Sequence, residues 1–186
     1  ALPQVFEDSP VDPAGIAQFA ERAEALGYTC LWTQDQLLGT VPVLDGLTTL
    51  SFIASRTTTI RLGVSVVVLS HRDPVPLAKM IASIDQLSGG RLELGLGSGA
   101  YQREFDRMKP GLQQKDSWQY MQEALPLIRQ LWQGDVEHNG RFWQFPKATS
   151  CPKPLQDEVP LWVAARSPIT FDYAVANDAH IMSWPL

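Results

Sequence analysis

Cysteine and histidine are scarce in this 186-residue sequence, which has two of the first and three of the second. Cys30 lies in an apolar stretch and Cys151 in a polar one, so we expect neither a disulfide framework nor a metal site. Long apolar runs are missing, and the N-terminus has no basic stretch followed by an apolar one. The sequence therefore shows no membrane span and no recognisable signal peptide, and we expect a reduced, cytoplasmic protein.

Runs of like charge are also missing. Lys and Arg number 15 against 20 Asp and Glu, which gives a net charge of −5, and the basic residues are scattered. Neutralising the phosphates of a nucleic acid requires a basic surface, so a nucleic-acid partner is not expected. The apolar share of 45% and the charged share of 19% are typical of a globular domain with a sizeable core.

Helical and strand patterns alternate along the chain. Apolar residues at helical spacing follow Asp12-Pro13 and Asp73-Pro74, which are typical helix starts, and Gly27 and Gly89 are typical helix ends. We expect helices over 13–26, 47–55, 74–88 and 116–132 and from 168 onward. Short apolar strands are expected over 28–32, 60–69, 92–96, 161–165 and 179–184, with a tight hairpin over 136–145. This alternation predicts an α/β fold with parallel strands.

Polar residues follow the predicted strands, each just past a strand's C-terminal end. They are Gln34, Asp35, His71, Ser98, Arg166 and Ser167. In a (β/α)₈ (TIM) barrel these positions meet on one face, where such barrels carry their sites. A doubly wound open sheet would bring together only those near its switch point.

The expected barrel is incomplete in this chain. Residues 1–4 are interpreted as the tail of a first strand, and the last predicted strand is the sixth. A full barrel needs about 250 residues, so we expect a single domain over 1–186 with about six of eight strands and without the C-terminal units.

Three glycines, Gly95, Gly97 and Gly99, interrupt the strand that begins near residue 92. Glycine weakens a strand, so something is expected to approach the backbone closely there, such as a phosphate or a flat ring. A Rossmann turn is one alternative, but the third glycine comes one residue early and 101–111 is interpreted as a loop. Small residues filling a crowded barrel mouth are another.

Four further positions have both a functional and a structural interpretation. Ser167-Pro168 with Arg166 could bind a phosphate at a helix N-terminus, or could be an ordinary cap. His71 could act as an acid or base, or could be a solvated loop residue. Asp35 could bind the edge of a heterocycle or cap a loop, and Trp184 could wall a ring or pack in the core.

The most specific stretch runs from Asp85 to Gly99, with Tyr101 and Phe105 following, and it resembles the bacterial luciferase-like family of flavin-dependent oxidoreductases. Matching segments follow in the family's order: His71–Pro74, Val136–Phe145, Trp162–Ser167 and Ile181–Trp184. The resemblance implies a (β/α)₈ barrel, usually dimeric, with FMN or the deazaflavin coenzyme F420 at its C-terminal face.

The resemblance also implies roles for individual residues. The cofactor phosphate would be held by four of them: Ser98, Arg166, Ser167 and Thr170. The flavin ring would be flanked by three: Asp35, Tyr101 and Trp184. Ser65-Val66 would form the family's non-prolyl cis peptide beside the ring.

Two departures from the family pattern leave the chemistry open. Gln36 replaces the usual histidine and cannot titrate, which favours His71 as a substitute and argues against the sugar-phosphate dehydrogenase type. Luciferase has an arginine where Ser98 stands, and Ser98 with Ser65-Val66 is more typical of deazaflavin enzymes. We expect a monooxygenase that uses reduced FMN and dioxygen on a small organic substrate, with a flavin reductase as a supplier of reduced flavin. A deazaflavin-dependent hydride transfer and a non-catalytic flavin-binding or partner subunit are the alternatives.

Overall fold

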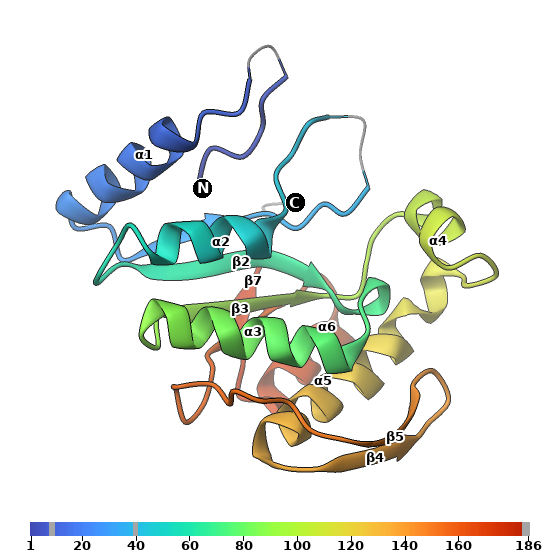
Figure 1. The fold of residues 1–186 in the computed structure, drawn as a ribbon. Helices are drawn as coiled ribbons and strands as arrows, with labels where there is room; N and C mark the ends of the chain where they lie inside the picture. Colours follow the sequence, from blue (N-terminus) through green and yellow to red (C-terminus); the bar gives the residue numbers. More distant parts are fainter. Residues whose placement is uncertain (8–9, 39–40, 184–186) are drawn as a thin grey trace.

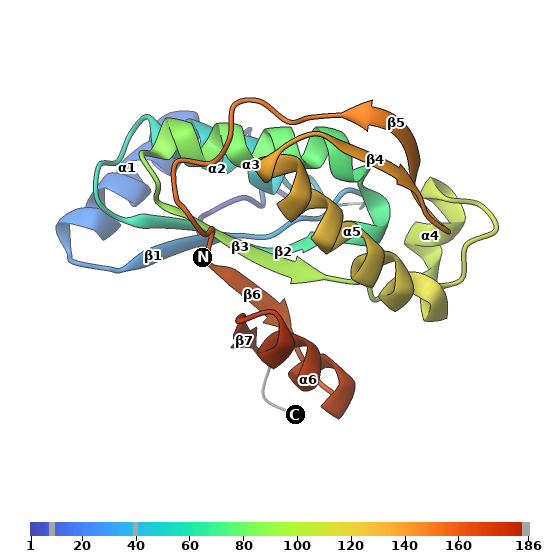
Figure 2. The same cartoon turned by 90° about the horizontal axis from the view of Figure 1, so that it is seen from below.

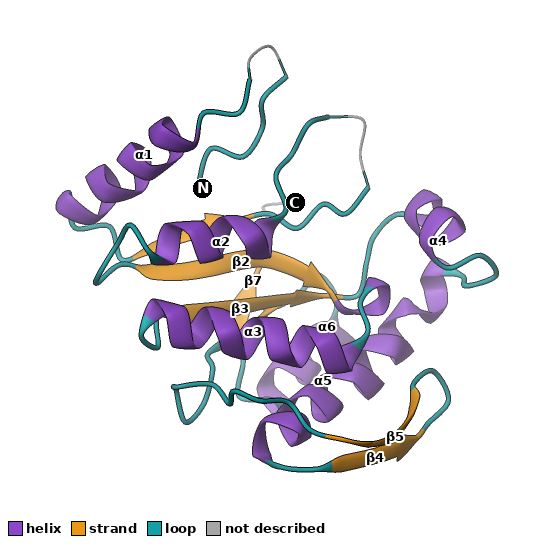
Figure 3. Cartoon of the chain, in the orientation of Figure 1, coloured by secondary structure: helices purple, strands orange, loops and turns teal. Residues whose placement is uncertain are grey.

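The computed structural model describes residues 1–7, 10–38 and 41–183. Its main sheet has five parallel strands, and their order in space is their order in the chain. Figure 3 shows these strands in orange. They are β1 (Cys30–Thr33), β2 (Arg61–Val68), β3 (Leu92–Gly97), β6 (Leu161–Ala164) and β7 (His180–Met182).

The helices between these strands begin where the sequence places capping aspartates. Asp12, Asp45 and Asp73 accept hydrogen bonds from the first-turn amides of α1, α2 and α3. Gly89 ends α3 with a left-handed φ of 68°. The helices are α1 (Pro13–Ala25), α2 (Gly46–Ala54), α3 (Pro74–Ser88), α4 (Gln102–Met108), α5 (Ser117–Gln133) and α6 (Pro168–Ala176), with short 3₁₀ turns η1 (Leu69–His71) and η2 (Gln114–Asp116). A separate antiparallel pair contains β4 (Val136–Asn139) and β5 (Gln144–Ala148).

One face of the sheet is covered by helices. Figure 1 shows α2 and α3 running along β2 and β3, and Figure 2, turned by 90°, shows them on the same side of these strands. Side chains on this face, such as Leu62, Val64 and Leu94, are fully buried. The opposite face is only half-buried at Trp32 and Trp162. The core therefore lies between sheet and helices, as in the wall of a barrel.

The half-buried face is concave. The rings of Trp32 in β1 and Trp162 in β6 lie 5.3 Å apart, although β2 and β3 separate their strands. The Ser65 hydroxyl in β2 lies 2.8 Å from the Met182 sulfur in β7, across β3 and β6. Contacts between non-neighbouring strands require strong curvature, so this face is the inside of the predicted barrel.

Three details of the predicted fold are wrong. Residues 102–108 form helix α4 and not a loop, because Phe105 is fully buried at the end of the strands and makes this short segment amphipathic. The hairpin has no tight Asn-Gly turn, since β4 and β5 are joined by residues 140–143. Residues 1–4 form no strand, although the Leu2 amide donates to the Trp32 carbonyl at 2.8 Å. The main sheet thus has five strands in the described residues instead of six.

No helix among the described residues is long and apolar enough to cross a membrane. Within the same residues, no group of three or more His, Cys, Asp or Glu side chains could hold a metal ion. Cys30 and Cys151 are both free thiols.

Candidate functional site

The C-terminal ends of the strands form one edge of the molecule, as predicted. Figure 1 shows the arrows of β2 and β3 pointing toward α4 at this edge. Arg72, which follows η1, donates from Nη2 to Asp35 Oδ1 at 2.6 Å and from Nε to Asp35 Oδ2 at 3.2 Å. The same Nη2 lies 3.2 Å from Asp45 Oδ2. Residues that follow β1 and β2 are therefore brought together by a buried ion pair.

This ion pair changes the interpretation of Asp35. The Asp35 side chain is fully buried and its carboxylate binds Arg72 in a two-point contact, so it does not present a free edge to a heterocycle. Burial alone would lower the pKa of Arg72, but its hydrogen bonds to Asp35 and Asp45 raise that pKa above its usual value. Burial opposes ionisation of Asp45 as well, yet bonds from Thr48 and from Arg72 hold its pKa below the usual value. Arg72 and Asp45 therefore both stay charged at neutral pH.

His71 is not a solvated loop residue. It is 7% exposed, its ring packs edge-on against Phe105 at 4.4 Å, and its Nε2 atom has no hydrogen-bond partner among the described residues. Burial lowers the pKa of His71, and the positive charges of Lys109 and Arg72 lower it further. The imidazole is therefore neutral at pH 7. Packing against Phe105 of α4 leaves little of the imidazole exposed, and its catalytic role stays a prediction.

A neutral buried histidine makes stability depend on pH. The folded pKa of His71 lies below the unfolded value of about 6.5, so at acidic pH the unfolded chain binds a proton that the folded chain rejects. The free energy of unfolding should therefore fall as the pH drops below about 6.5. Urea denaturation of wild type and His71→Phe at about pH 7.5 and about pH 5 measures this. The variant should lose part of the decrease in the free energy of unfolding between the two pH values. His180→Gln, at an exposed histidine, is the control and should keep it. An unchanged slope in His71→Phe would contradict the assignment.

A second group of polar residues follows the neighbouring strands β3 and β6. Gly95 and Leu96 pair with Trp162 and Val163, so Ser98 and Arg166 emerge side by side at the strand ends. The Ser98 hydroxyl has no hydrogen-bond partner among the described residues, while the Ser98 carbonyl accepts from Ser70 at 2.7 Å. The Arg166 guanidinium is exposed and forms no ion pair with any described residue. Two donors without a partner among the described residues therefore lie at the same edge.

The start of α6 adjoins these donors. The Thr170 hydroxyl accepts from the backbone amides of Arg166 and Ser167 at 3.0 and 3.1 Å and donates to the Ser167 carbonyl at 2.8 Å. The proton of Thr170 is thus already used within the loop, so Thr170 orders the loop. The Ser167 hydroxyl lies 3.3 Å from the Thr170 hydroxyl, and the two residues form a capping box at the start of α6.

The glycines of β3 are close to protein atoms. A Cβ at Gly95 would collide with the backbone carbonyl of Val64, and one at Gly97 would lie 2.5 Å from a methyl of Val66. Atoms therefore do approach the β3 backbone closely, as predicted, but they belong to Val64 and Val66 of β2 and not to a ligand. The Ser65-Val66 peptide is cis, as the family resemblance implies, and interrupts the register between β2 and β3.

The remaining predicted residues lie at the same edge or outside the described part of the chain. Gln36 follows β1, and its amide makes one long contact of 3.4 Å to the Leu38 carbonyl. Tyr101 precedes α4, is 56% exposed and carries the Arg103 guanidinium over its ring at 4.9 Å. Trp184 lies outside the described residues.

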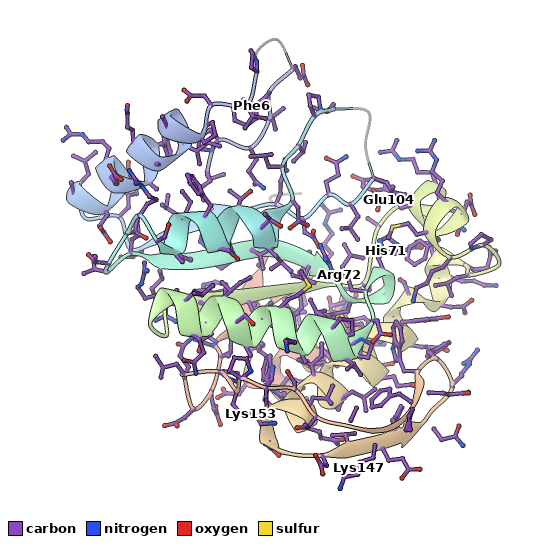
Figure 4. All side chains as sticks on the ribbon, viewed as in Figure 1. Phe6, His71, Arg72, Glu104, Lys147 and Lys153 are labelled. Atoms are coloured by element: carbon purple, nitrogen blue, oxygen red, sulfur yellow. The ribbon has the colours of Figure 1, made fainter. Side chains whose placement is uncertain are left out.

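Sequence reasoning missed three residues at this edge: Arg72, Asp45 and Glu104. Figure 4 shows Arg72, His71 and Glu104 gathered where the strands end, far from Lys147 and Lys153. Burial raises the pKa of Glu104, with Arg103 opposing and Asp35 adding to the rise. The polar run after β2 was the available signal for Arg72. Nothing in the sequence pairs it with positions 35 and 45.

Residues 3–185 match the model of the luciferase-like monooxygenase family. The oxygenase component of a flavin-dependent trigonelline monooxygenase from Acinetobacter baylyi is 39% identical over 92% of this chain and 47% of that protein. An F420-dependent glucose-6-phosphate dehydrogenase from Amycolatopsis mediterranei is 31% identical over 87% of this chain and 50% of that protein.

Solved structures show the same fold. The monooxygenase RslO1 from Streptomyces bottropensis superposes with a TM-score of 0.83 at 25% identity, over 97% of this chain and 57% of that one. This confirms the predicted luciferase-like barrel, of which the described residues form part. The chain spans about half the length of the curated relatives it matches.

Proposed function

Because the chain belongs to the luciferase-like monooxygenase family, we propose that it forms the flavin-binding part of an oxidoreductase that uses reduced FMN and dioxygen on a small organic substrate. The observation that carries this proposal is the pair of unpartnered donors at adjacent strand ends, the Ser98 hydroxyl and the Arg166 guanidinium. A phosphate accepts from both kinds of donor, and guanidinium binds it in a two-point contact. The donors therefore fit the phosphate end of FMN.

The inner face fits the ring end of the same cofactor. Ser65, Val66 and Ala164 are half-buried there, and no charged side chain stands at these three positions. A surface of small uncharged side chains lets a flat ring approach the wall and excludes water from it. When bound, reduced FMN supplies the electrons that activate dioxygen.

The protein's own contribution is binding, orientation and proton placement. Gln36 carries an amide where the family pattern has a titratable histidine, and neutral His71 is buried behind Phe105. Glu104 is half-buried near Asp35 and has a raised pKa, so it holds a proton more readily than an ordinary glutamate. Glu104 therefore joins His71 as a proposed proton-handling residue at this edge.

Flavins with and without a phosphate test the proposal. Arg166→Ala should weaken FMN binding by about tenfold or more, because a charge-assisted hydrogen bond contributes roughly 1.5–3 kcal/mol. Riboflavin has no phosphate, so its affinity should not change. Arg56→Ala is the matched control, since Arg56 is an exposed arginine paired with Glu21. Fluorescence titration of wild type and the two variants with both flavins measures the six affinities. Equal losses for both flavins in Arg166→Ala, or no flavin binding by wild type, would contradict the proposal.

A deazaflavin-dependent hydride transfer is the second candidate. The similarity to an F420-dependent dehydrogenase over 87% of this chain favours it. Titration with the deazaflavin next to FMN separates the two candidates, and dioxygen consumption is expected only with FMN.

The proposed partners follow from the first candidate. One relative is named as an oxygenase component, which supports a separate flavin reductase as the source of reduced flavin. A homodimer and a cytoplasmic location remain predictions from the sequence. Size-exclusion chromatography with light scattering tests the first.

A further inference from the structure

The segment between β1 and α2 has its two ends tied together from outside. At one level Arg72 binds Asp35, near the start of this segment, and Asp45, at its end. The Arg72 side chain is 13% exposed, the Asp35 side chain is fully buried and the Asp45 side chain is 36% exposed. One guanidinium therefore holds two carboxylates that are ten positions apart in the chain.

Gln4 makes a second, uncharged tie one residue earlier at each end. Its amide nitrogen donates to the Gln34 carbonyl at 3.2 Å and to the Leu44 carbonyl at 3.0 Å. Its amide oxygen accepts from the Gln34 backbone at 2.7 Å, and Gln4 is 3% exposed. The base of the segment is thus made of Gln34 and Asp35 at its start and Leu44 and Asp45 at its end. The side chains of Gln4 and Arg72 hold these two ends together.

Gln36 is the next residue after this base. Among the described residues its side chain has one contact, of 3.4 Å to the Leu38 carbonyl, so its position depends on the backbone that carries it. That backbone is fixed relative to β2 by Arg72, which lies close to the end of the strand carrying Ser65-Val66. The Arg72 contacts therefore fix the β1–α2 segment relative to β2, whose Ser65-Val66 peptide lies beside the proposed flavin ring.

We propose that Arg72 is a positioning residue of the site, which holds the base of the β1–α2 segment and thereby the position of Gln36 relative to the inner wall. This inference rests on the proposed function for its consequence, since it assumes that the mouth binds a flavin. The contacts of Arg72 with Asp35 and Asp45 are present in the protein without cofactor. Its alternative is that Arg72 only neutralises the buried Asp35.

Paired variants separate positioning from charge compensation. Arg72→Met leaves the Asp35 carboxylate buried without a partner, which should destabilise the fold strongly. Arg72→Met combined with Asp35→Asn removes both charges and should recover most of that stability. The double variant also lacks the hydrogen bond from Arg72 to Asp45, so the segment should stay loosened in it if Arg72 positions the segment. Arg56→Met, at an exposed ion pair, is the control.

The decisive measurement is hydrogen exchange of the backbone amides in residues 34–38 and 43–46, read by mass spectrometry without flavin. In the double variant these amides should exchange about tenfold faster than in wild type, while β2 and β3 keep their protection. Arg72→Lys, which keeps a charge but loses the two-point contact, should show an intermediate rate. Recovery of wild-type protection in the double variant would overturn the proposal in favour of charge compensation.

The cofactor readout tests the link to the proposed function separately. Where wild type binds FMN, the double variant should bind it about fivefold more weakly, at a stability close to wild type. Unchanged FMN affinity despite faster exchange would overturn the positioning role. Absence of FMN binding in wild type would refute the proposed function, and the exchange rates would then still decide whether Arg72 holds the segment.

Discussion

Replacing Arg91 with methionine should lower the free energy of unfolding by about 3–5 kcal/mol, because it leaves buried acceptors without a donor. Arg91 is 9% exposed and its guanidinium makes five hydrogen bonds. Their acceptors are the carbonyls of Ala54, Thr57, Ile60 and Ser88 and the hydroxyl of Thr57. One guanidinium therefore joins the end of α2, the turn before β2 and the end of α3.

Arg91→Lys should recover only a small part of the loss, since an ammonium offers three donors without the planar fork. Arg56→Met is the control, because Arg56 pairs with Glu21 at the surface with side chains 49% and 43% exposed. It should cost no more than about 1 kcal/mol. Chemical denaturation of the three variants measures the differences, and a loss in Arg91→Met no larger than in Arg56→Met would refute this role.

The most specific part of the sequence thus proves to be largely structural. Asp85 is fully buried and accepts from the amides of Leu155 and Gln156 and from the Gln156 side chain at 2.7–2.9 Å. Asp85 and Arg91 precede β3, so they lie at the end opposite to Ser98. The contacts of Asp85 and Arg91 therefore hold together the segments at the barrel's N-terminal end. The contribution of this stretch to the site comes from Gly97, which adjoins Val66, and from the residues after β3.

Most of the fold could be predicted because its signals are local. Aspartate caps, apolar periodicity and left-handed glycines give the helices and strands to within a few residues. The long-range order of the parallel strands followed from their alternation with helices. Helix α4 was missed because it has only seven residues and is stabilised by burial of Phe105, which is a tertiary effect.

The site could be predicted only in outline. Strand ends placed Asp35, His71, Ser98 and Arg166 at one edge, but their partners could not be read from the sequence. Asp35 is bound by Arg72, and His71 is covered by Phe105, so both are less available than their positions suggest. Contacts such as these depend on side chains from distant segments, which no local pattern encodes.

Replacing Gly95 with alanine should destabilise the protein by about 3 kcal/mol, at the upper end for overpacking a core position. The added Cβ would overlap the backbone carbonyl of Val64 in the neighbouring strand. A backbone atom in the middle of a five-stranded sheet cannot move without disturbing the register on both sides. The requirement for glycine at this position therefore comes from the fold and needs no ligand.

Two other glycines calibrate this prediction. Gly97→Ala meets a methyl of Val66, a half-buried side chain that can shift, so its cost should be smaller. Gly134→Ala meets no atom within 4 Å at a φ of −171°, and should change stability by no more than about 0.5 kcal/mol. Thermal and urea unfolding should rank the losses Gly95 > Gly97 > Gly134. The loss of flavin affinity should not follow the loss of stability across these variants, because Val66 lies on the inner face of the sheet and Val64 in the core. Gly97→Ala should therefore weaken flavin binding more than its stability loss implies, and a Gly95 variant as stable as the Gly134 variant would refute the steric account of this strand.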